Sequence, residues 1–230
     1  MSEIIGNAAY FGVTISLAGY AVGLWLKKKV KKPYANPLLI AILLVMGALL
    51  LLGIDYDVYN ESAKYLSYLL TPATVCLAIP LYQQLTLLKK HWKAVVGGLT
   101  AGVASSLVSV LGLSMLFGLT HEQYVSLLPK SITTAIGMGL SEELGGIVTL
   151  TVASIILTGV LGAVIGEGVC KLFRIRERVA VGLAFGSAAH AVGTSRALEI
   201  GEIEGAMSSL AIAVSGLITV TVASFFVGLY

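Results

Sequence analysis

The chain has 230 residues, of which 57% are hydrophobic and only 12% are charged, against about 25% charged in ordinary soluble domains. A mean hydropathy of +0.93 and several continuous apolar runs of about 20 residues predict an all-α polytopic membrane protein and disfavour a membrane β-barrel. The net charge of +3 does not indicate a nucleic-acid partner, because most basic residues lie in short clusters between the apolar runs, where they mark topology.

Seven apolar segments are long enough to cross a lipid bilayer, and an eighth is too short and polar to cross alone. The predicted crossings are 4–26, 36–54, 65–88, 94–119, 146–172, 179–198 and 206–230. The eighth segment, 131–145, is expected to enter and leave on one side as a re-entrant segment, or to form half of a broken crossing. We expect residues 1–64 to form an N-terminal scaffold or dimerisation pair and residues 65–230 to form the core.

The basic residues suggest an orientation. Placing the loops 27–33, 89–93 and 171–178 in the cytoplasm collects 12 of the 15 lysines and arginines there, as the positive-inside rule requires. The acidic loops 55–61 and 199–204 then lie outside. This arrangement predicts an external N-terminus and a cytoplasmic C-terminus. No cleavable signal peptide is expected, because the lysine cluster follows the first apolar run.

Three segments contain residues that break helices inside apolar surroundings. The first contains Pro72 and Pro80, each of which removes a backbone donor and clashes with the preceding turn. The second contains Gly137 and Gly139, and the third contains Gly193. Interrupted segments of this kind are the best sequence indicator of a transporter binding site, since half-helix N-termini can present free N–H groups to an anion.

The third segment also carries ionisable residues, which are costly at membrane depth and therefore functional candidates. Arg196 could bind a substrate carboxylate through its planar guanidinium group, or it could form an ion pair with Glu199. His190 could carry a coupling proton, or it could be a neutral histidine bonded to a carbonyl at a helix break. In the second segment, one of Glu142 and Glu143 could be a proton or cation site, or both could be exposed.

Hydroxyl groups complete the predicted substrate site. The candidates are Thr74, Thr133, Thr134, Ser141, Thr194 and Ser195. Each could instead pack between helices, and Thr194 could bond back to its own helix. The other of Glu142 and Glu143 could cap a helix or form an ion pair, for which Lys130 is a candidate partner. No metal-ligand or nucleophile motif is present, so neither an enzyme, a metal nor a cofactor is expected.

Three motifs resemble those of the LrgB/CidB family. They are Thr71-Pro72-Ala73-Thr74 through Ala78-Ile79-Pro80-Leu81-Tyr82, Lys130-Ser131-Ile132-Thr133-Thr134 through Gly139-Leu140-Ser141-Glu142-Glu143-Leu144-Gly145-Gly146, and His190 with 193–199 and 201–206. The chain departs from the family pattern at Ala135, where a proline is expected, and at Glu167, in a stretch that the family usually keeps uncharged.

The resemblance implies two functions. Bacterial members are named antiholin-like and are linked to control of murein hydrolase activity and cell lysis, usually beside a small holin-like LrgA/CidA-type membrane partner. Relatives have been assigned transport of small carboxylates, and the family is grouped with transporters built from two inverted repeats. The leading prediction is therefore a proton- or sodium-coupled transporter of small monocarboxylates in the bacterial cytoplasmic (inner) membrane. The alternative is the antiholin-like regulator. A homodimer is expected by analogy.

Overall fold

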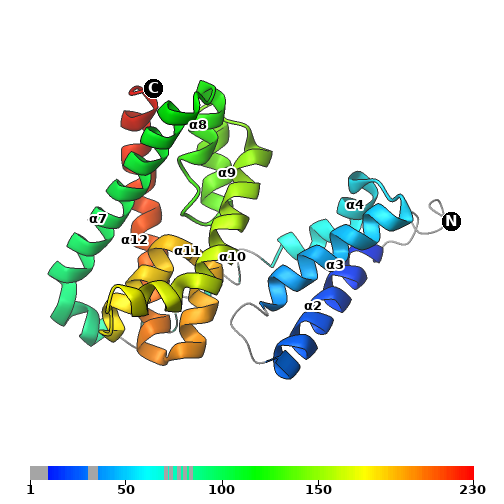
Figure 1. Ribbon diagram of the computed structural model, residues 1–230, viewed down its shortest axis with the longest axis horizontal. Helices are drawn as coiled ribbons and strands as arrows, with labels where there is room; N and C mark the ends of the chain where they lie inside the picture. Colours follow the sequence, from blue (N-terminus) through cyan, green and yellow to red (C-terminus); the bar gives the residue numbers. More distant parts are fainter. Residues whose placement is uncertain are drawn as a thin grey trace. The chain divides into compact units, whose positions relative to one another are not determined.

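The computed structural model describes residues 10–30, 36–69 and 85–230, together with positions 72, 75, 76, 79 and 82 (Figure 1). All regular secondary structure among these residues is helical. The chain divides into two compact units, Met1–Cys76 and Leu77–Tyr230. The predicted boundary between residues 64 and 65 falls inside a helix of the first unit, and most of the predicted break at Pro72 to Pro80 lies outside the described residues.

The first unit contains α2 (Phe11–Val30), α3 (Pro37–Leu52) and α4 (Tyr56–Ser67). The Asn36 side chain caps α3 by accepting a hydrogen bond from Leu38 N at 2.9 Å, and Gly53 ends the helix with a φ of 62°. The Gly12 N–H donates to Ser62 Oγ at 2.6 Å, which joins α2 to α4. Local caps and close backbone contacts thus define this unit, as is usual where small residues bring helices together.

Residues 85–230 of the second unit form six helices. They are α7 (Leu85–Phe117), α8 (His121–Leu127), α9 (Thr134–Glu143), α10 (Val148–Leu172), α11 (Arg178–Ile200) and α12 (Glu202–Val227). Among the described residues, three helical segments are long and apolar enough to cross a membrane: Lys89–Phe117, Val148–Leu172 and Glu202–Val227. An all-α membrane protein is therefore supported. The count of seven crossings and the transporter-like core stay predictions.

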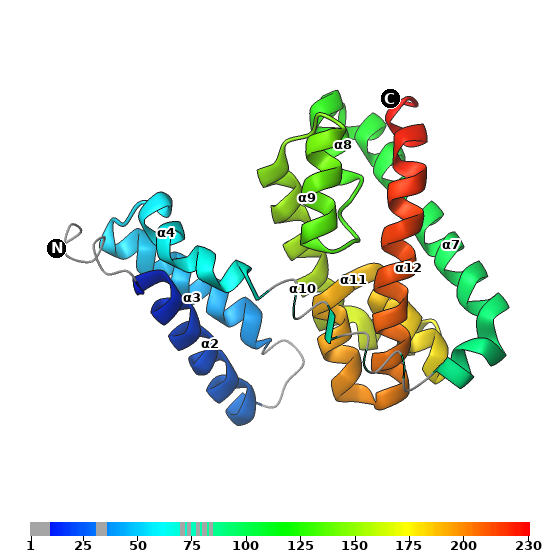
Figure 2. The ribbon, with the colours of Figure 1, turned by 180° about the vertical axis from the view of Figure 1, so that it is seen from behind.

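The helices α8 and α9 form a hairpin, which we call the first hairpin (Figure 2). Its two arms are joined through α10, where the Thr151 hydroxyl donates to the Ser126 carbonyl oxygen at 2.8 Å and lies 2.7 Å from Ser141 Oγ. A capping box at Thr120 begins α8, and the Thr133 side chain caps α9. The tip of the hairpin is the short loop between the two helices, residues 128–133.

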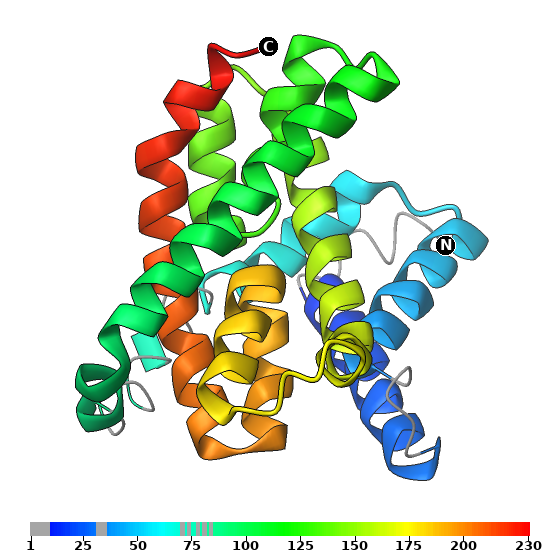
Figure 3. The same cartoon turned by 60° about the vertical axis from the view of Figure 1, so that its left-hand side comes forward.

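The helix α11 is a second hairpin, because its backbone reverses at His190. This residue has φ 40° and ψ −132°, far outside the helical region. A Cβ atom at Gly193 would lie only 2.4 Å from the carbonyl oxygen of Phe185, although eight residues of continuous helix would separate them by about 12 Å. The two arms of this second hairpin lie side by side (Figure 3).

The second hairpin begins and ends at the same end of the unit. Arg178, the first residue of α11, lies 3.9 Å from Glu204 in the first turn of α12. The prediction of a single crossing over 179–198, with the loops 171–178 and 199–204 on opposite sides, is therefore wrong. Composition and length cannot distinguish a crossing from a reversal that depends on one residue.

The C-terminal residue lies at the other end of the unit. The Tyr230 hydroxyl donates to the carbonyl oxygen of Ser114 at 3.2 Å and to that of Leu119, where α7 ends. The C-terminus and the basic loop 171–178 therefore occupy opposite ends of the second unit, whereas the sequence prediction placed both on the cytoplasmic side.

Candidate functional site

Both hairpins contact one residue of α10. His190 Nε2, at the second tip, donates to the Ile155 carbonyl oxygen at 2.9 Å. A Cβ atom at Gly137, in the first hairpin, would lie 2.5 Å from Ile155 Cδ1. The second and third interrupted segments of the sequence are thus brought together.

His190 is buried, with 3% of its surface exposed. Because the carbonyl of Ile155 can only accept, Nε2 carries the hydrogen in this bond. The ring fits against α10 at Gly159, where a Cβ atom would lie 2.5 Å from Cε1. This geometry corresponds to the structural alternative considered for His190, a histidine bonded to a carbonyl at a helix break. Its role in proton coupling stays a prediction.

Thr194 and Ser208 connect the second hairpin to α12. The Thr194 hydroxyl donates to the His190 carbonyl oxygen at 3.0 Å and lies 2.7 Å from Ser208 Oγ. Both side chains have no exposed surface. The bond to His190 is the back-bond to its own helix that the sequence offered as one alternative for Thr194.

Lys130 has only neutral partners. Its ammonium group donates to Ser106 Oγ at 3.1 Å and to Ser131 Oγ at 3.0 Å. Among the described residues, no carboxylate lies within ion-pair distance of this group. The candidate partners Glu142 and Glu143 are both exposed and lie at the opposite end of α9 from Lys130. These two carboxylates therefore do not lie beside Lys130 at the first tip.

The other predicted hydroxyls are divided between the tip and the far end of the first hairpin. Thr133 Oγ1 accepts from Ile136 N at 3.4 Å, and Thr134 is the first residue of α9. Ser141 is fully buried near the other end of α9, bonded to Thr151. Only Thr133 and Thr134 therefore lie beside the tip loop.

Arg196 lies six residues beyond the second tip and is paired with two carboxylates. Its guanidinium group donates to Glu199, as one sequence alternative proposed, and to Glu167 of α10. Arg196 keeps 27% of its side chain exposed, and the neighbouring Ser195 is exposed. Substrate binding by either residue stays a prediction.

The predicted helix breaks fall at several kinds of position. Gly137 and Gly139 lie inside α9, and Gly193 lies inside the second arm of α11, three residues beyond the reversal at His190. Pro72 occupies a helical position. Thr74 and Pro80 are outside the described residues. Within the described part of the chain, no group of three histidine, cysteine or acidic residues could hold a metal ion.

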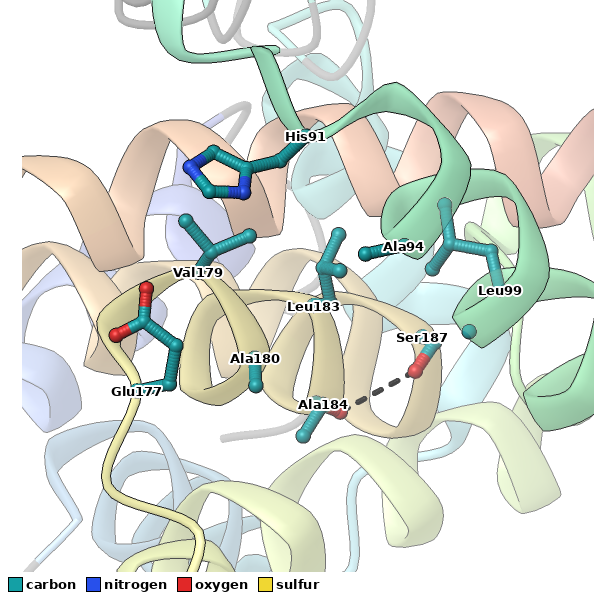
Figure 4. Close-up of a pocket in the computed structure, with 10 residues that line it drawn as sticks. His91, Ala94, Leu99, Glu177, Val179, Ala180, Leu183, Ala184 and Ser187 are labelled. Carbon is teal, nitrogen blue, oxygen red and sulfur yellow. Dashed lines mark hydrogen bonds between the residues drawn. The ribbon is translucent and has the colours of Figure 1, made fainter.

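A pocket of about 420 Å³ lies between α7 and the first arm of α11 (Figure 4). Its lining consists of His91, Ala94, Gly98 and Leu99 from α7, and Glu177, Val179, Ala180, Leu183, Ala184 and Ser187 from the start of α11. The backbone of α7 is kinked at His91, with φ −111°. The lining is largely apolar, and its polar side chains are one imidazole, one carboxylate and the Ser187 hydroxyl.

Comparison with known proteins decides the family. The model of the LrgB-like family matches residues 16–229. This chain belongs to the LrgB-like family. It is 37% identical over 218 residues to the antiholin-like protein LrgB of Bacillus mycoides strain KBAB4, with 94% of this chain and 95% of the relative covered. The proteins of the same name from Bacillus cereus strain B4264 and Bacillus anthracis strain CDC 684 / NRRL 3495 match to the same extent. No solved structure matches this chain.

The sequence analysis of this LrgB-like chain did not include Lys130, Ser106 or Ser187 in the predicted site. One signal pointed to Lys130. Only three basic residues lie outside the clusters that mark topology, namely Lys64, Lys130 and Arg196, and a basic residue without a topological role in an apolar chain is a functional candidate. Nothing in the sequence distinguishes Ser106 and Ser187 from hydroxyls that pack between helices.

Proposed function

We propose that this chain is an antiholin-like membrane protein that restrains murein hydrolase activity and cell lysis together with a small holin-like partner. One observation carries the proposal, which is the 37% identity over 94% of the chain to proteins named antiholin-like protein LrgB. Apolar helices long enough to cross a membrane are consistent with action from the bacterial cytoplasmic membrane, where small-residue faces allow helices of a partner to approach closely.

The test is removal and restoration of the chain in its host. Deletion is expected to raise extracellular murein hydrolase activity and the rate of autolysis, and expression of the intact chain is expected to restore both. Co-purification of the cognate holin-like protein in mild detergent tests the partner. Unchanged autolysis and hydrolase activity after deletion would contradict the regulatory role.

A second candidate is a secondary transporter of small monocarboxylates, coupled to protons or sodium. The specific observation that favours it is the pair of hairpins. They enter the second unit from opposite ends, each contains non-helical backbone, and both contact Ile155 of α10. Non-helical backbone is tolerated at membrane depth only where protein or a water-filled cavity surrounds it, and transporters place their binding sites at such breaks between inverted repeats.

Uptake of labelled pyruvate and glycolate into proteoliposomes tests the transporter. A proton or sodium gradient is expected to drive accumulation above that in protein-free liposomes. The variant Arg196→Ala separates the two functions, because loss of uptake with normal control of autolysis would make transport the primary activity. Absence of uptake under every gradient would contradict this candidate. A homodimer stays a prediction that mass measurement in detergent can check.

A further inference from the structure

The tip of the first hairpin brings an ammonium group and one hydroxyl against a second hydroxyl on α7, and no carboxylate of the described residues pairs with that ammonium group. We propose that Lys130, Ser106 and Ser131 form the binding site for a small monovalent anion. The inference goes beyond the antiholin-like role and adds a charged residue to the transporter candidate. It rests on that candidate only for whether the bound anion is then transported. Binding itself is a separate and measurable property.

The hydrogen-bonding groups of the cluster favour an anion. An ammonium group has three N–H donors, and Lys130 uses two of them on Ser106 and Ser131. The two serine oxygens lie 3.4 Å apart. Since each oxygen already accepts from the ammonium group, at most one hydroxyl hydrogen can be used between them. The third N–H and the other hydroxyl hydrogen remain for a ligand that accepts hydrogen bonds.

The charge of the cluster gives the same result. Lys130 is half-buried. A charge partly removed from water is stabilised by an opposite charge as well as by hydrogen bonds, and neutral hydroxyls supply only the hydrogen bonds. No carboxylate of the described residues lies within ion-pair distance of Lys130. His190 adds no negative charge, and its Nε2 hydrogen is committed to Ile155. One uncompensated positive charge matches one monovalent anion.

One residue of the pocket between α7 and α11 lies near the part of α7 that carries Ser106. Ser187 Oγ would lie 3.8 Å from a Cβ atom at Gly102, and Ser106 is one helical turn further along α7.

The variant Lys130→Met tests the proposal, with Lys171→Met as the matched control because Lys171 is exposed. The purified full chain is titrated with sodium acetate and with sodium chloride at equal ionic strength, and thermal unfolding is followed. We expect a saturable rise in Tm for the wild-type chain and for Lys171→Met, because a ligand that binds only the folded state stabilises it. Lys130→Met is expected to lose at least about tenfold in affinity.

A second variant covers the case in which Lys130→Met does not fold. Ser131→Ala keeps the charge and removes one hydroxyl, and it is expected to weaken anion binding by about tenfold. The proposal is overturned if neither anion shifts the wild-type Tm, or if every folded variant binds as the wild-type chain does. Uptake by proteoliposomes without a Lys130-dependent anion effect would leave the transporter candidate intact and remove this site. Altered autolysis has no bearing on it.

Discussion

The two hairpins of the second unit reverse the chain in different ways. The first hairpin uses a six-residue loop between α8 and α9, with a capping box at Thr120 and a side-chain cap at Thr133. The second reverses at one residue, His190, in a positive-φ conformation that side chains rarely adopt. The ammonium group at the first tip has hydrogen-bond donors that remain for a ligand. At the second tip, His190 Nε2 donates to the Ile155 carbonyl oxygen, and the His190 carbonyl oxygen accepts from the Thr194 hydroxyl.

This difference shows where stability and binding capacity lie. A reversal at one strained residue requires surroundings that hold it in place, and the second hairpin obtains them by close packing against α10 and α12. The capped loop of the first hairpin needs less support from its neighbours, so that its tip can carry a charge without an ionic partner. We therefore expect substitutions to act mainly on folding in the second hairpin and on ligand binding in the first.

The largest expected effect comes from adding one methyl group to each hairpin. A Cβ atom at Gly186 would lie 2.2 Å from the Ser208 carbonyl oxygen, whereas one at Gly137 meets the mobile end of Ile155. Gly186→Ala should therefore cost about 3 kcal/mol through backbone displacement, and Gly137→Ala about 1 kcal/mol. Gly168→Ala is the control, because it meets nothing within 4 Å. Thermal unfolding in detergent gives the order, and equal Tm values for all three would contradict the close packing.

The reversal at His190 can be tested by comparing two substitutions there. Both His190→Ala and His190→Gly remove the bond to Ile155, but only alanine retains the cost of the positive φ. We expect His190→Gly to be more stable than His190→Ala by about 1 kcal/mol. At the helical control position Ala184, the substitution Ala184→Gly should instead destabilise by about 1 kcal/mol. A glycine variant at His190 less stable than the alanine variant would argue against the strained reversal.

The cap of the first hairpin should have a moderate effect. Thr133→Ala removes the side-chain oxygen that accepts from Ile136 N, and loss of such a cap costs about 1 kcal/mol. Thr134→Ala, one residue later, removes no capping bond and should leave the Tm nearly unchanged. Chemical or thermal unfolding of both variants measures the difference, which should vanish if the tip is not organised by its cap.

The smallest expected effect is at Arg196. Its ion pairs with Glu167 and Glu199 are partly exposed, and such pairs contribute less than about 1 kcal/mol. Arg196→Gln should therefore leave the Tm within about 3 °C of the wild-type value. Uptake measured on the same preparation separates the alternatives for this residue. Normal stability with lost uptake would support substrate binding, and a large drop in Tm would show that the pairs hold the second hairpin together.

The sequence predicted an all-α membrane protein and identified its interrupted segments. It did not predict the direction in which the chain runs through those segments. Hydropathy identified α10 and α12 as apolar helices, because a run of about 20 apolar residues by itself indicates a helix in apolar surroundings. It could not identify the second hairpin as a reversal, since the arms of α11 have the composition of a crossing and the decisive φ belongs to one residue, His190.

The candidate site was predicted in part for a related reason. His190 and Thr194 were selected because polar residues in an apolar run are visible in the sequence, and both lie at the hairpin tip. Ser106 could not be selected, because its role depends on the approach of Lys130 from the tip loop of the first hairpin. Side-chain pairing across helices is a property of packing, which a single sequence does not report.

The ion pair between Arg178 and Glu204 has a consequence for how the chain is inserted in the membrane. Because the second hairpin returns to the end from which it starts, the last helix carries the chain away from the basic loop 171–178. If that loop is held in the cytoplasm by the positive-inside rule, the final residue Tyr230 emerges on the outer face. Alkaline phosphatase fused after Tyr230 should then be active, and a fluorescent protein fused at the same point should be dark.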